Sequence, residues 1–251
     1  CFQHLKPIFD TTDIVVGNLE TTISADGTYR GYPRFKSPAD LIPALDACGF
    51  DALVLANNHI CDWGSDGIEA TVDGLEKYGI PYTGAFKDST GLKERHPMIL
   101  EHGSIRFAIL NYTYGTNGMP VPQDRIVNLI DTARMAADLA AIDRSNTDYV
   151  VMFLHWGVEY ARRASMEQKK LAAWCRDRGA DLVIGSHPHV VQPIESWTDS
   201  NGRVSGATVY SMGNLVSNQR KRYTDGGILV KVDITRSAGL PDSLAVSYIP
   251  V

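Results

Sequence analysis

Short apolar runs of strand length alternate with longer segments of helical periodicity along most of this chain. Residues 51–56 (DALVLA) form one such run, and the amphipathic pattern of residues 66–78 follows it. Strands that alternate with helices are typical of sheets whose strands are joined by helical crossovers, and not of all-β or all-α folds. The alternation therefore predicts an α/β fold.

The same patterns predict the individual elements. The expected strands cover residues 13–17, 51–56, 98–100, 105–110, 149–154, 182–184, 208–210, 228–234 and 244–248. The expected helices cover residues 38–48, 66–78, 126–142 and 165–178. Ser65 is expected to cap the second helix, because its hydroxyl can accept a hydrogen bond from a free amide at the helix start. Turn-forming residues make 112–122 and 197–205 the predicted linkers or site-flanking loops.

The bulk composition excludes some classes of protein. With 24 basic against 29 acidic side chains the net charge is −5, which argues against a nucleic-acid binder that relies on bulk phosphate attraction. A local basic pocket stays compatible with this balance. The chain has no run of about 18 apolar residues that would span a membrane. Its four cysteines are widely spaced and predict neither a zinc knuckle nor a dense disulfide framework, so the compartment is left open.

Four of the expected strands end in loops whose first residues can bind metal or phosphate. These loops begin with Asn18-Leu19-Glu20, Asn57-Asn58-His59, His155-Trp156-Gly157 and Ser186-His187-Pro188-His189. In open α/β sheets the carboxyl ends of the strands form the ligand crevice. We therefore expect the four loops to converge on one site.

Each of these residues also has a plainer role open to it. Glu20 could cap the loop that follows it, and Asn58 could hold a turn with its side chain. His59 could be a hydrogen-bonded core histidine, and His155 could bond to a carbonyl group. An isolated His-x-His pair is weak evidence for a metal, because histidines also cap helices and fill polar cores. Together, however, one carboxylate, one amide and three imidazoles at four strand ends favour a metal site.

The donor types indicate which metals fit. Oxygen and nitrogen ligands without thiolate suit zinc, manganese or iron. Paired metal ions about 3.5–4 Å apart commonly share a bridging carboxylate, a role that Glu20 would fill. His59 follows a ligand and could donate a proton to the leaving oxygen. The predicted metal ligands are Glu20, Asn58, His155, His187 and His189, and the predicted catalytic residue is His59.

Basic side chains follow two of the predicted site segments. Arg162 and Arg163 come after the His155 loop, and three more cations follow Asn214. Guanidinium and ammonium groups can bind carboxylate or phosphate, although the alternative is that they line solvated faces. The cations after Asn214 are Arg220, Lys221 and Arg222. The predicted substrate-binding residues are Arg162, Arg163, Asn214 and Arg220.

Five ordered segments carry a resemblance to a known family. They are GNLETTIS at 17–24, ANNHICDWGSDGI at 56–68, LHWGVEY at 154–160, IGSHPHVVQPIE at 184–195 and YSMGNLVSNQ at 210–219. With these segments the chain resembles the capsule synthesis protein CapA family, also described as poly-γ-glutamate synthesis proteins, over nearly its whole length. The fold of that family is similar to calcineurin-like metallophosphoesterases. The resemblance implies a metallophosphoesterase-like layered sandwich, with mixed β-sheets flanked by helices, as a single domain over residues 1–251.

The resemblance also implies roles for individual residues. Glu20 stands where the phosphoesterase-like fold has its bridging carboxylate. Asn58 and His59 match an Asn-His motif in which the asparagine binds metal and the histidine contacts the scissile group. The three histidine ligand positions are matched by His155, His187 and His189. The resemblance thus implies two divalent metal ions, which could be manganese, zinc or iron.

One departure from the family concerns the start of the chain. The family normally begins with a strand that ends in a Gly-Asp motif, whose aspartate binds one metal, and no such strand precedes Cys1. Either this N-terminal strand is missing or one metal site is incomplete, and we expect the former, because residues 7–13 look like the helix and entry that would follow the strand. A signal or anchor would then lie in the same missing segment. Glu20 also stands where many phosphoesterases have aspartate, which leaves metal identity and substrate open.

The predicted function is that of a metal-dependent, hydrolase-like protein of capsule or poly-γ-glutamate biosynthesis, release or anchoring. As an enzyme it would be a dinuclear-metal hydrolase of the phosphoesterase type. The alternatives are a non-catalytic scaffold that binds polymer in a capsule assembly complex, and a phosphodiesterase that acts on small phosphoesters. The expected partners are an anionic polymer or phosphoester substrate and membrane proteins of capsule synthesis, but not nucleic acid. The expected location is the cell envelope, outside the cytoplasm.

Overall fold

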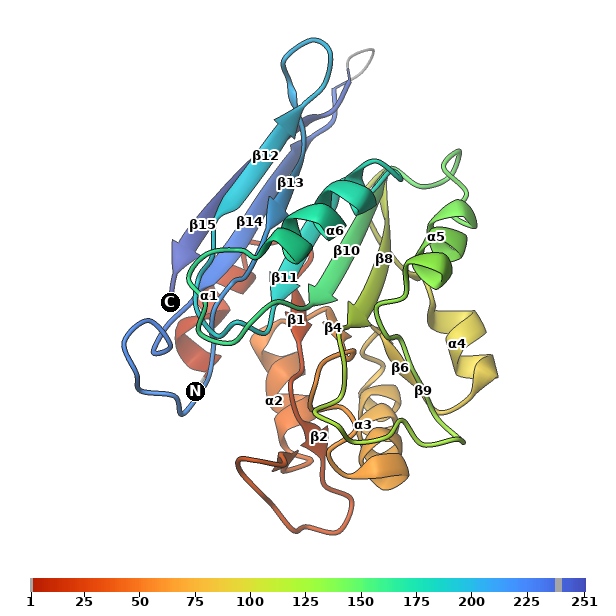
Figure 1. The fold of residues 1–251 in the computed structure, drawn as a ribbon, viewed down its shortest axis with the longest axis vertical. Coiled ribbons are helices and arrows are strands. Elements are labelled where there is room, and N and C mark those ends of the chain that lie inside the picture. Colours follow the sequence, from red (N-terminus) through yellow and green to blue (C-terminus); the bar gives the residue numbers. More distant parts are fainter. Residues whose placement is uncertain (1, 238–240) are drawn as a thin grey trace. The chain divides into compact units, whose positions relative to one another are not determined.

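The chain divides into two compact units, Cys1–Asp148 and Tyr149–Val251. The structure is a computed structural model, and it describes residues 2–237 and 241–251. Figure 1 labels the helices and strands in chain order. Within the two described ranges, no helix combines the length and the hydropathy of a membrane-spanning segment.

The first unit contains short helices and strands that alternate. Its helices are η1 (Phe2–His4), α1 (Lys6–Phe9), α2 (Leu41–Cys48), α3 (Gly64–Tyr78), α4 (Ser89–Arg95) and α5 (Thr132–Ala140). Its strands are β1 (Val16–Asn18), β2 (Thr22–Ile23), β3 (Lys36–Ser37), β4 (Ala52–Val54), β5 (Tyr82–Thr83), β6 (Ala85–Phe86), β7 (Met98–His102), β8 (Ile105–Thr113) and β9 (Ile126–Val127).

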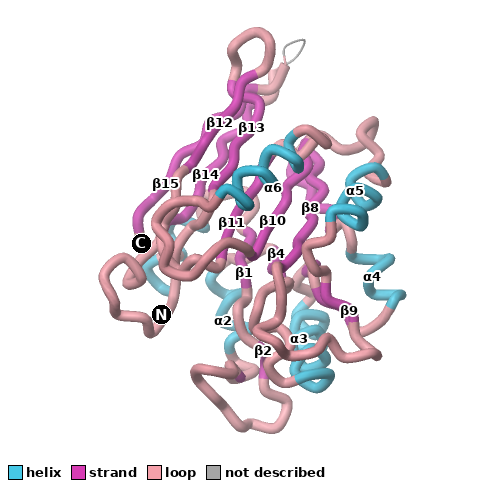
Figure 2. Tube along the Cα trace, in the orientation of Figure 1, coloured by secondary structure: helices cyan, strands magenta, loops and turns pink. Residues whose placement is uncertain are grey.

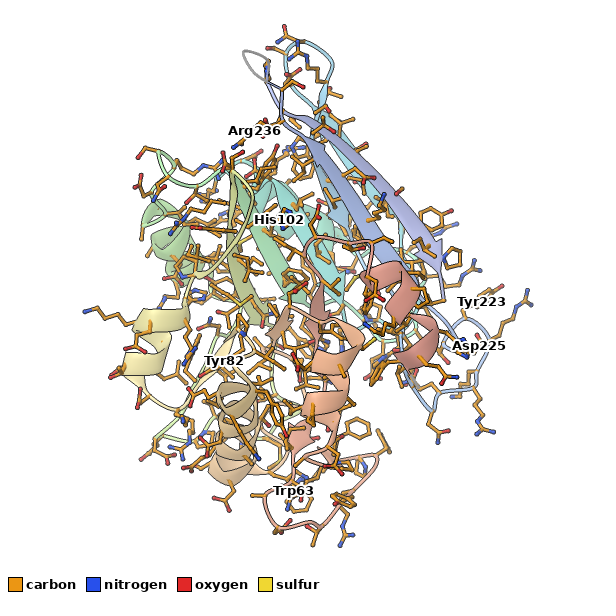
Figure 3. All side chains as sticks on the ribbon, turned by 180° about the vertical axis from the view of Figure 1, so that it is seen from behind. Trp63, Tyr82, His102, Tyr223, Asp225 and Arg236 are labelled. Carbon is orange, nitrogen blue, oxygen red and sulfur yellow. The ribbon has the colours of Figure 1, made fainter. Side chains whose placement is uncertain are left out.

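A parallel sheet in the order β1-β4-β5 positions the candidate residues of the first unit. Leu53 of β4 pairs with Gly17 of β1 on one side and with Tyr82 of β5 on the other. Tyr82 is only 1% exposed, and Figure 3 shows its place inside this unit. Because β1 and β4 run in the same direction, the loops that follow them leave the sheet at the same edge.

Helix α3 supplies much of the packing in this unit. Ile68, Val72 and Leu75 lie three or four positions apart, so they share one face of the helix, and all three are fully buried. The helix contacts β2, β6 and α2. It ends where Gly79 adopts a left-handed conformation with φ +68°, which glycine adopts without steric cost.

The second unit contains a mixed sheet and a long hairpin. Its elements are β10 (Tyr149–His155), α6 (Met166–Arg176), β11 (Leu182–Ser186), β12 (Ile194–Thr198), β13 (Val204–Val209), β14 (Ile228–Thr235) and β15 (Ser243–Pro250). The sheet has the order β12-β13-β11-β10, in which β10, β11 and β13 are parallel and β12 is antiparallel. Strands β14 and β15 pair with each other as an antiparallel hairpin.

The register of β10 and β11 positions the candidate histidines. His155, the last residue of β10, pairs with Ser186, the last residue of β11. Every residue of β10 is buried, as expected for a parallel strand that is covered on both faces. Figure 2 shows the loops that leave the ends of β10 and β11 side by side. The sheet therefore brings two polar loops of this unit to one edge.

Several predicted elements are confirmed. The helix predicted for 38–48 is α2, which ends at Gly49 with φ +103°. The strands predicted for 98–100 and 105–110 are β7 and β8, and they form a hairpin with Gly103 at φ +59° in its turn. The helix predicted from residue 165 is α6, and Ser165 caps it with a reciprocal capping box that involves Gln168.

Two helix predictions were wrong in detail. Ser65 does not cap α3, because the helix already begins at Gly64, and the Ser65 hydroxyl instead donates to Asp124 Oδ1 at 2.7 Å. The helix predicted for 126–142 is only α5, from Thr132 to Ala140. The side chain of Asp131 accepts hydrogen bonds from the first amides of this helix, and residues 126–127 pair with β6 instead.

The predicted linkers are shorter than expected. Strand β12 extends into the segment 197–205, and β13 begins at Val204, so only a tight turn remains between them. The Asp199 side chain closes this turn by accepting from the amides of Asn201 and Arg203. Strand β8 likewise extends through Thr113 into the segment 112–122. The apolar pattern of these strand ends was too short to separate them from the turns.

Candidate functional site

In the first unit, the side chain of Asn57 joins the loop after β4 to the loop after β1. Asn57 Nδ2 donates to the main-chain oxygen of Leu19 at 2.8 Å and lies 3.3 Å from Asn18 Oδ1. Asn57 Oδ1 accepts from the main-chain amide of His59 at 3.0 Å. Asn18 Nδ2 in turn donates to Glu20 Oε2 at 3.3 Å. Glu20 and the Asn58-His59 segment are therefore held by one hydrogen-bonded network.

His59 forms a buried dyad with Asp62. His59 Nδ1 lies 2.7 Å from Asp62 Oδ2. His59 is 6% exposed and Asp62 is 1% exposed. The same Oδ2 accepts from the main-chain amide of Phe35 at 2.6 Å. A carboxylate can only accept, so Nδ1 of His59 carries the hydrogen and Nε2 is the basic nitrogen. Asn117 Nδ2 lies 3.4 Å from that Nε2.

Asn58 is buried beside the dyad. It is 1% exposed, and its Nδ2 donates to Asn117 Oδ1 at 3.2 Å. Because the side-chain nitrogen of Asn58 is a hydrogen-bond donor, only its oxygen Oδ1 could bind a metal. Asn117 thus contacts both neighbours, and it does so from a left-handed backbone conformation with φ +52°.

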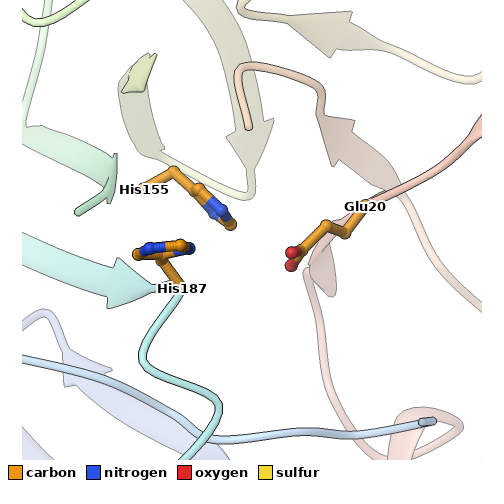
Figure 4. Close-up of side chains that lie close together, drawn as sticks. All are labelled: Glu20, His155 and His187. Carbon is orange, nitrogen blue, oxygen red and sulfur yellow. The ribbon is translucent and has the colours of Figure 1, made fainter. Parts of the chain in front are cut away.

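In the second unit, His155 and His187 lie side by side at the ends of β10 and β11 (Figure 4). Their ring centroids are 4.9 Å apart, and they are 1% and 5% exposed. His155 Nδ1 is 2.8 Å from Ser186 Oγ. A hydrogen bond at one ring nitrogen orients the ring and leaves the other nitrogen as the ligand atom, an arrangement common among metal-binding histidines.

The turn His187-Pro188-His189 has an unusual backbone. His187 and His189 both have positive φ angles, +100° and +58°. His189 Nδ1 lies 2.9 Å from Asn214 Oδ1, and Asn214 Nδ2 donates to the main-chain oxygen of Thr224 at 2.9 Å. Because the amide oxygen only accepts, Nδ1 of His189 carries the hydrogen, and Nε2 is the nitrogen that could bind a metal.

Glu159 completes a donor group in this unit. One ligand atom each from Glu159, His187 and His189 lies within 4.8 Å of the other two. Glu159 is exposed, whereas His187 is buried and His189 is half-buried. One carboxylate and two imidazoles form a donor set that suits zinc, manganese or iron, so the residues present fit a divalent transition metal.

The predicted substrate-binding residues take different positions. Arg162 is exposed and lies 4.0 Å from the ring centroid of Tyr223. Arg163 and Arg220 are also exposed. Asn214 contacts His189, as described above, and this contact positions the histidine. Substrate binding by these four residues stays a prediction.

The sequence patterns missed three residues that hold the candidate histidines. Asp62 stands three residues after His59 in the same loop, so its spacing alone could have indicated the dyad. Ser186 directly precedes His187 and could have been paired with His155 from the strand register. Asn117 lies 58 residues beyond His59, and no local pattern connects the two.

A solved structure confirms the predicted fold. The chain is similar to the 5'-nucleotidase from Candida albicans SC5314 with a TM-score of 0.51 and 13% identity. The superposition covers 98% of this chain and 45% of that protein. The mixed α/β arrangement, with several sheets flanked by helices, is therefore metallophosphoesterase-like.

Comparison of sequences identifies the family. The PGA biosynthesis protein CapA of Bacillus subtilis (strain 168) is 28% identical over 250 residues, which cover 94% of this chain and 61% of that protein. The capsule biosynthesis protein CapA of Bacillus anthracis is 28% identical over 250 residues, which cover 92% of this chain and 56% of that protein. The chain thus spans little more than half the length of these relatives. The family described as bacterial capsule synthesis protein PGA_cap matches residues 1–219, and the chain belongs to that family.

Proposed function

We propose that this chain is a metal-dependent, hydrolase-like protein that acts in the synthesis, release or anchoring of an anionic capsule polymer, with poly-γ-glutamate as the polymer. The names of the relatives, a PGA biosynthesis protein and a capsule biosynthesis protein, support the biological context. The observation that carries the hydrolase part is the His187-Pro188-His189 turn. It offers two imidazoles from left-handed backbone positions, with the Glu159 carboxylate within 4.8 Å.

The proposed ligands combine residues of both units. We assign Glu20, Asn58, His155, His187 and His189 to two divalent ions, with manganese, zinc and iron as the candidates. The convergence of these side chains on one metal pair is part of the proposal. When bound, such ions supply Lewis acidity that polarises a carbonyl or phosphoryl oxygen. The absence of thiolate among the donors supports a catalytic rather than a structural role.

The His59–Asp62 dyad supplies the proton chemistry in this proposal. The Asp62 carboxylate holds the ring in the tautomer with hydrogen on Nδ1, and it stabilises the imidazolium when Nε2 also binds a proton. His59 then holds that proton on Nε2 and transfers it to the leaving oxygen or nitrogen. Asn117, 3.4 Å from Nε2, keeps the ring facing one direction. Since both members of the dyad are buried, water competes little for the proton.

The setting follows from the family context. We propose that the protein works at the cell envelope, outside the cytoplasm, on an anionic polymer and alongside membrane proteins of capsule synthesis. The net charge of −5 does not favour nucleic acid as a partner.

Metal binding tests the first part of the proposal. The purified chain is equilibrated with Mn²⁺ or Zn²⁺, dialysed, and assayed by elemental analysis and thermal unfolding. We expect bound metal and a raised Tm for the wild type, and loss of both in His187→Ala/His189→Ala. His102→Ala is the matched control, because His102 is an exposed histidine of the first unit. A wild-type chain that neither retains metal nor gains stability from it would end the metal proposal.

Turnover tests the second part. Wild type and His59→Ala are compared on a generic phosphodiester and on poly-γ-glutamate, with metal content measured in the same samples. We expect His59→Ala to keep its metal and to lose about 100- to 10,000-fold in rate, the range for general acid–base groups. Unchanged turnover removes His59 from the mechanism. Polymer binding without turnover that survives the loss of both His187 and His189 identifies a non-catalytic scaffold instead.

A further inference from the structure

Five exposed cations of the second unit lie in two loop segments, one that follows His155 and one that follows Asn214. They are Arg162, Arg163, Arg220, Lys221 and Arg222. Among residues 2–237 and 241–251, no carboxylate lies within 4.0 Å of any of these five cations. Elsewhere in the chain, lysines pair with carboxylates at 2.7 Å. This group is therefore a local excess of positive charge on a chain whose net charge is negative.

Two tyrosine rings hold three of these cations. The guanidinium carbons of Arg162 and Arg222 lie 4.0 Å and 4.8 Å from the ring centroid of Tyr223. Lys221 Nζ lies 5.8 Å from the ring centroid of Tyr160. Figure 3 shows Tyr223 on the outer loop that follows β13. Two positive charges that share one ring repel each other, so an anion bound between them would relieve that repulsion.

Both tyrosines have strained backbones. Tyr160 and Tyr223 have φ angles of +65° and +75°, a region that bulky side chains rarely occupy. In the described part of the second unit, His187 and His189 are the other non-glycine residues with positive φ. Such strain persists where the surrounding structure imposes it, and it gathers at functional sites. Tyr160 and Tyr223 therefore share this backbone strain with the candidate metal ligands His187 and His189.

Tyr160 contacts the turn of the candidate histidines directly, whereas Tyr223 is connected to it through the main chain of its neighbour Thr224. The ring centroids of Tyr160 and His189 lie 6.1 Å apart, and the main-chain amide of Tyr160 donates to the main-chain oxygen of Pro188 at 2.8 Å. On the other side, Asn214 contacts His189 through Oδ1 and the main-chain oxygen of Thr224 through Nδ2. Thr224 directly follows Tyr223. The ring of Tyr160 thus lies beside the His187-Pro188-His189 turn, and the main chain next to Tyr223 is connected to His189 through Asn214.

We propose that Arg162, Lys221 and Arg222, held on the rings of Tyr160 and Tyr223, bind successive carboxylates of poly-γ-glutamate beside the candidate metal ligands. We call these five residues the polymer cluster. This inference rests on the proposed function, and it names the residues and the chemical groups by which the polymer is recognised.

The arrangement fits a polycarboxylate better than a compact anion. The three cations are distributed over two rings, which matches single charges repeated along a flexible chain, and the guanidinium fork matches a carboxylate. The exposed tyrosine rings, 49% and 41% exposed, offer apolar surface to the methylene groups between the carboxylates.

Polymer binding by the 251-residue chain tests the inference. Fluorescence anisotropy of a labelled poly-γ-glutamate oligomer is measured at low salt against wild type and Arg162→Ala/Arg222→Ala. We expect the double variant to bind about tenfold more weakly, because each exposed ion pair contributes a few-fold to a binding constant. Arg178→Ala is the matched control. Arg178 is exposed and lies 4.1 Å from the ring centroid of Trp174, outside the polymer cluster, so its loss is expected to change nothing.

A second pair of variants tests the role of the Tyr223 ring. Tyr223→Phe keeps the aromatic face and is expected to keep binding, whereas Tyr223→Ala is expected to weaken it about as much as the arginine variant does. Retention of Mn²⁺ or Zn²⁺ by every variant shows that the histidines are intact.

Three results would overturn the inference. The first is equal affinity of wild type and Arg162→Ala/Arg222→Ala for the oligomer. The second is displacement of the oligomer by inorganic phosphate at the same concentration as by free oligomer, which would indicate a general anion site. The third is wild-type protein that retains metal but binds no oligomer, which would leave the proposed metal-dependent function standing while the polymer cluster fails.

Discussion

Replacement of Asp62 by asparagine should weaken the histidine dyad while it preserves the shape of the site. Asp62 Oδ2 accepts from His59 Nδ1 at 2.7 Å and from the Phe35 amide at 2.6 Å, in a residue that is 1% exposed. A hydrogen bond to a charged group contributes about 1.5–3 kcal/mol and a neutral one about 1 kcal/mol. Asparagine keeps a neutral acceptor, so each bond weakens by about 1 kcal/mol. We expect Asp62→Asn to lower the free energy of unfolding by about 2 kcal/mol.

Alanine in place of Asp62 should lower the free energy of unfolding more than asparagine does. Asp62→Ala removes the acceptor altogether and leaves the Phe35 amide and the ring of His59 without it. A buried donor that loses its partner costs about 1–3 kcal/mol, so this variant should lose about 3–5 kcal/mol. Asp10→Asn is the control, because Asp10 pairs with Lys6 on the surface, where an ion pair contributes little to stability.

Urea unfolding, followed by intrinsic fluorescence, measures these free energies. A double-mutant cycle with His59→Gln and Asp62→Asn should give a coupling energy of about 1–2 kcal/mol, within the range for residues in contact. Turnover of the proposed substrate should fall about fivefold in Asp62→Asn, because the hydrogen bond that holds the His59 ring weakens by about 1 kcal/mol. If Asp62→Asn is as stable as wild type and the two substitutions are additive within about 0.3 kcal/mol, the reasoning about the dyad is refuted.

Two further substitutions test the packing at Gly185 and the ionisation of Asp138. A Cβ at Gly185 would collide with the main-chain oxygen of Tyr210 and with the indole nitrogen of Trp156, which hydrogen-bond each other at 2.9 Å. Gly185→Ala should lower the free energy of unfolding by about 2–4 kcal/mol and reduce metal retention, and wild-type values in thermal unfolding and elemental analysis would contradict this. Burial raises the pKa of Asp138, but hydrogen bonds from His96 and two further neighbours outweigh it and lower the pKa from 3.8 to about 2. Since the folded pKa lies below the ordinary one, the stabilisation is complete above about pH 4 and is lost as the pH falls towards 2. Asp138→Asn should remove about 1–2 kcal/mol at pH 7 and little at pH 2, and urea unfolding with the same pH dependence in variant and wild type would disprove this.

The local sequence pattern correctly predicted those helices whose ends are determined by neighbouring residues. The helix before Gly49 ends as expected, because a left-handed residue at that point needs glycine. The prediction failed at 126–142, where the helical pattern begins six residues too early. Ile126 and Val127 pair with β6, a strand about 40 residues earlier in the chain, and Asp131 starts the helix by capping its first amides. A pairing over that separation leaves no mark on the local pattern.

In the candidate site, too, contacts within one loop or between neighbouring strands could be predicted, whereas contacts between distant segments could not. The position of His155 and His187 at neighbouring strand ends follows from the parallel register, so the sequence could predict that they lie together. Asp62 was in the predicted loop but received no role, although its spacing from His59 places it within reach of the ring. Asn117 comes from a distant loop, and only the folded chain brings it to His59. The assignment of Glu20 as a bridging ligand stays a prediction.

The distribution of backbone strain gives an independent reason to connect these side chains with function. Glycine occupies eleven left-handed positions in the described chain, where it costs no strain. Five other residues adopt the same conformation: Asn117, Tyr160, His187, His189 and Tyr223. All five contact the dyad, belong to the candidate metal ligands or carry the polymer cluster. At about 1 kcal/mol or more for each histidine and tyrosine, glycine would relieve the strain if these side chains only filled space. Their presence at these positions therefore supports the proposal that the imidazoles bind metal and that the tyrosine rings take part in polymer binding.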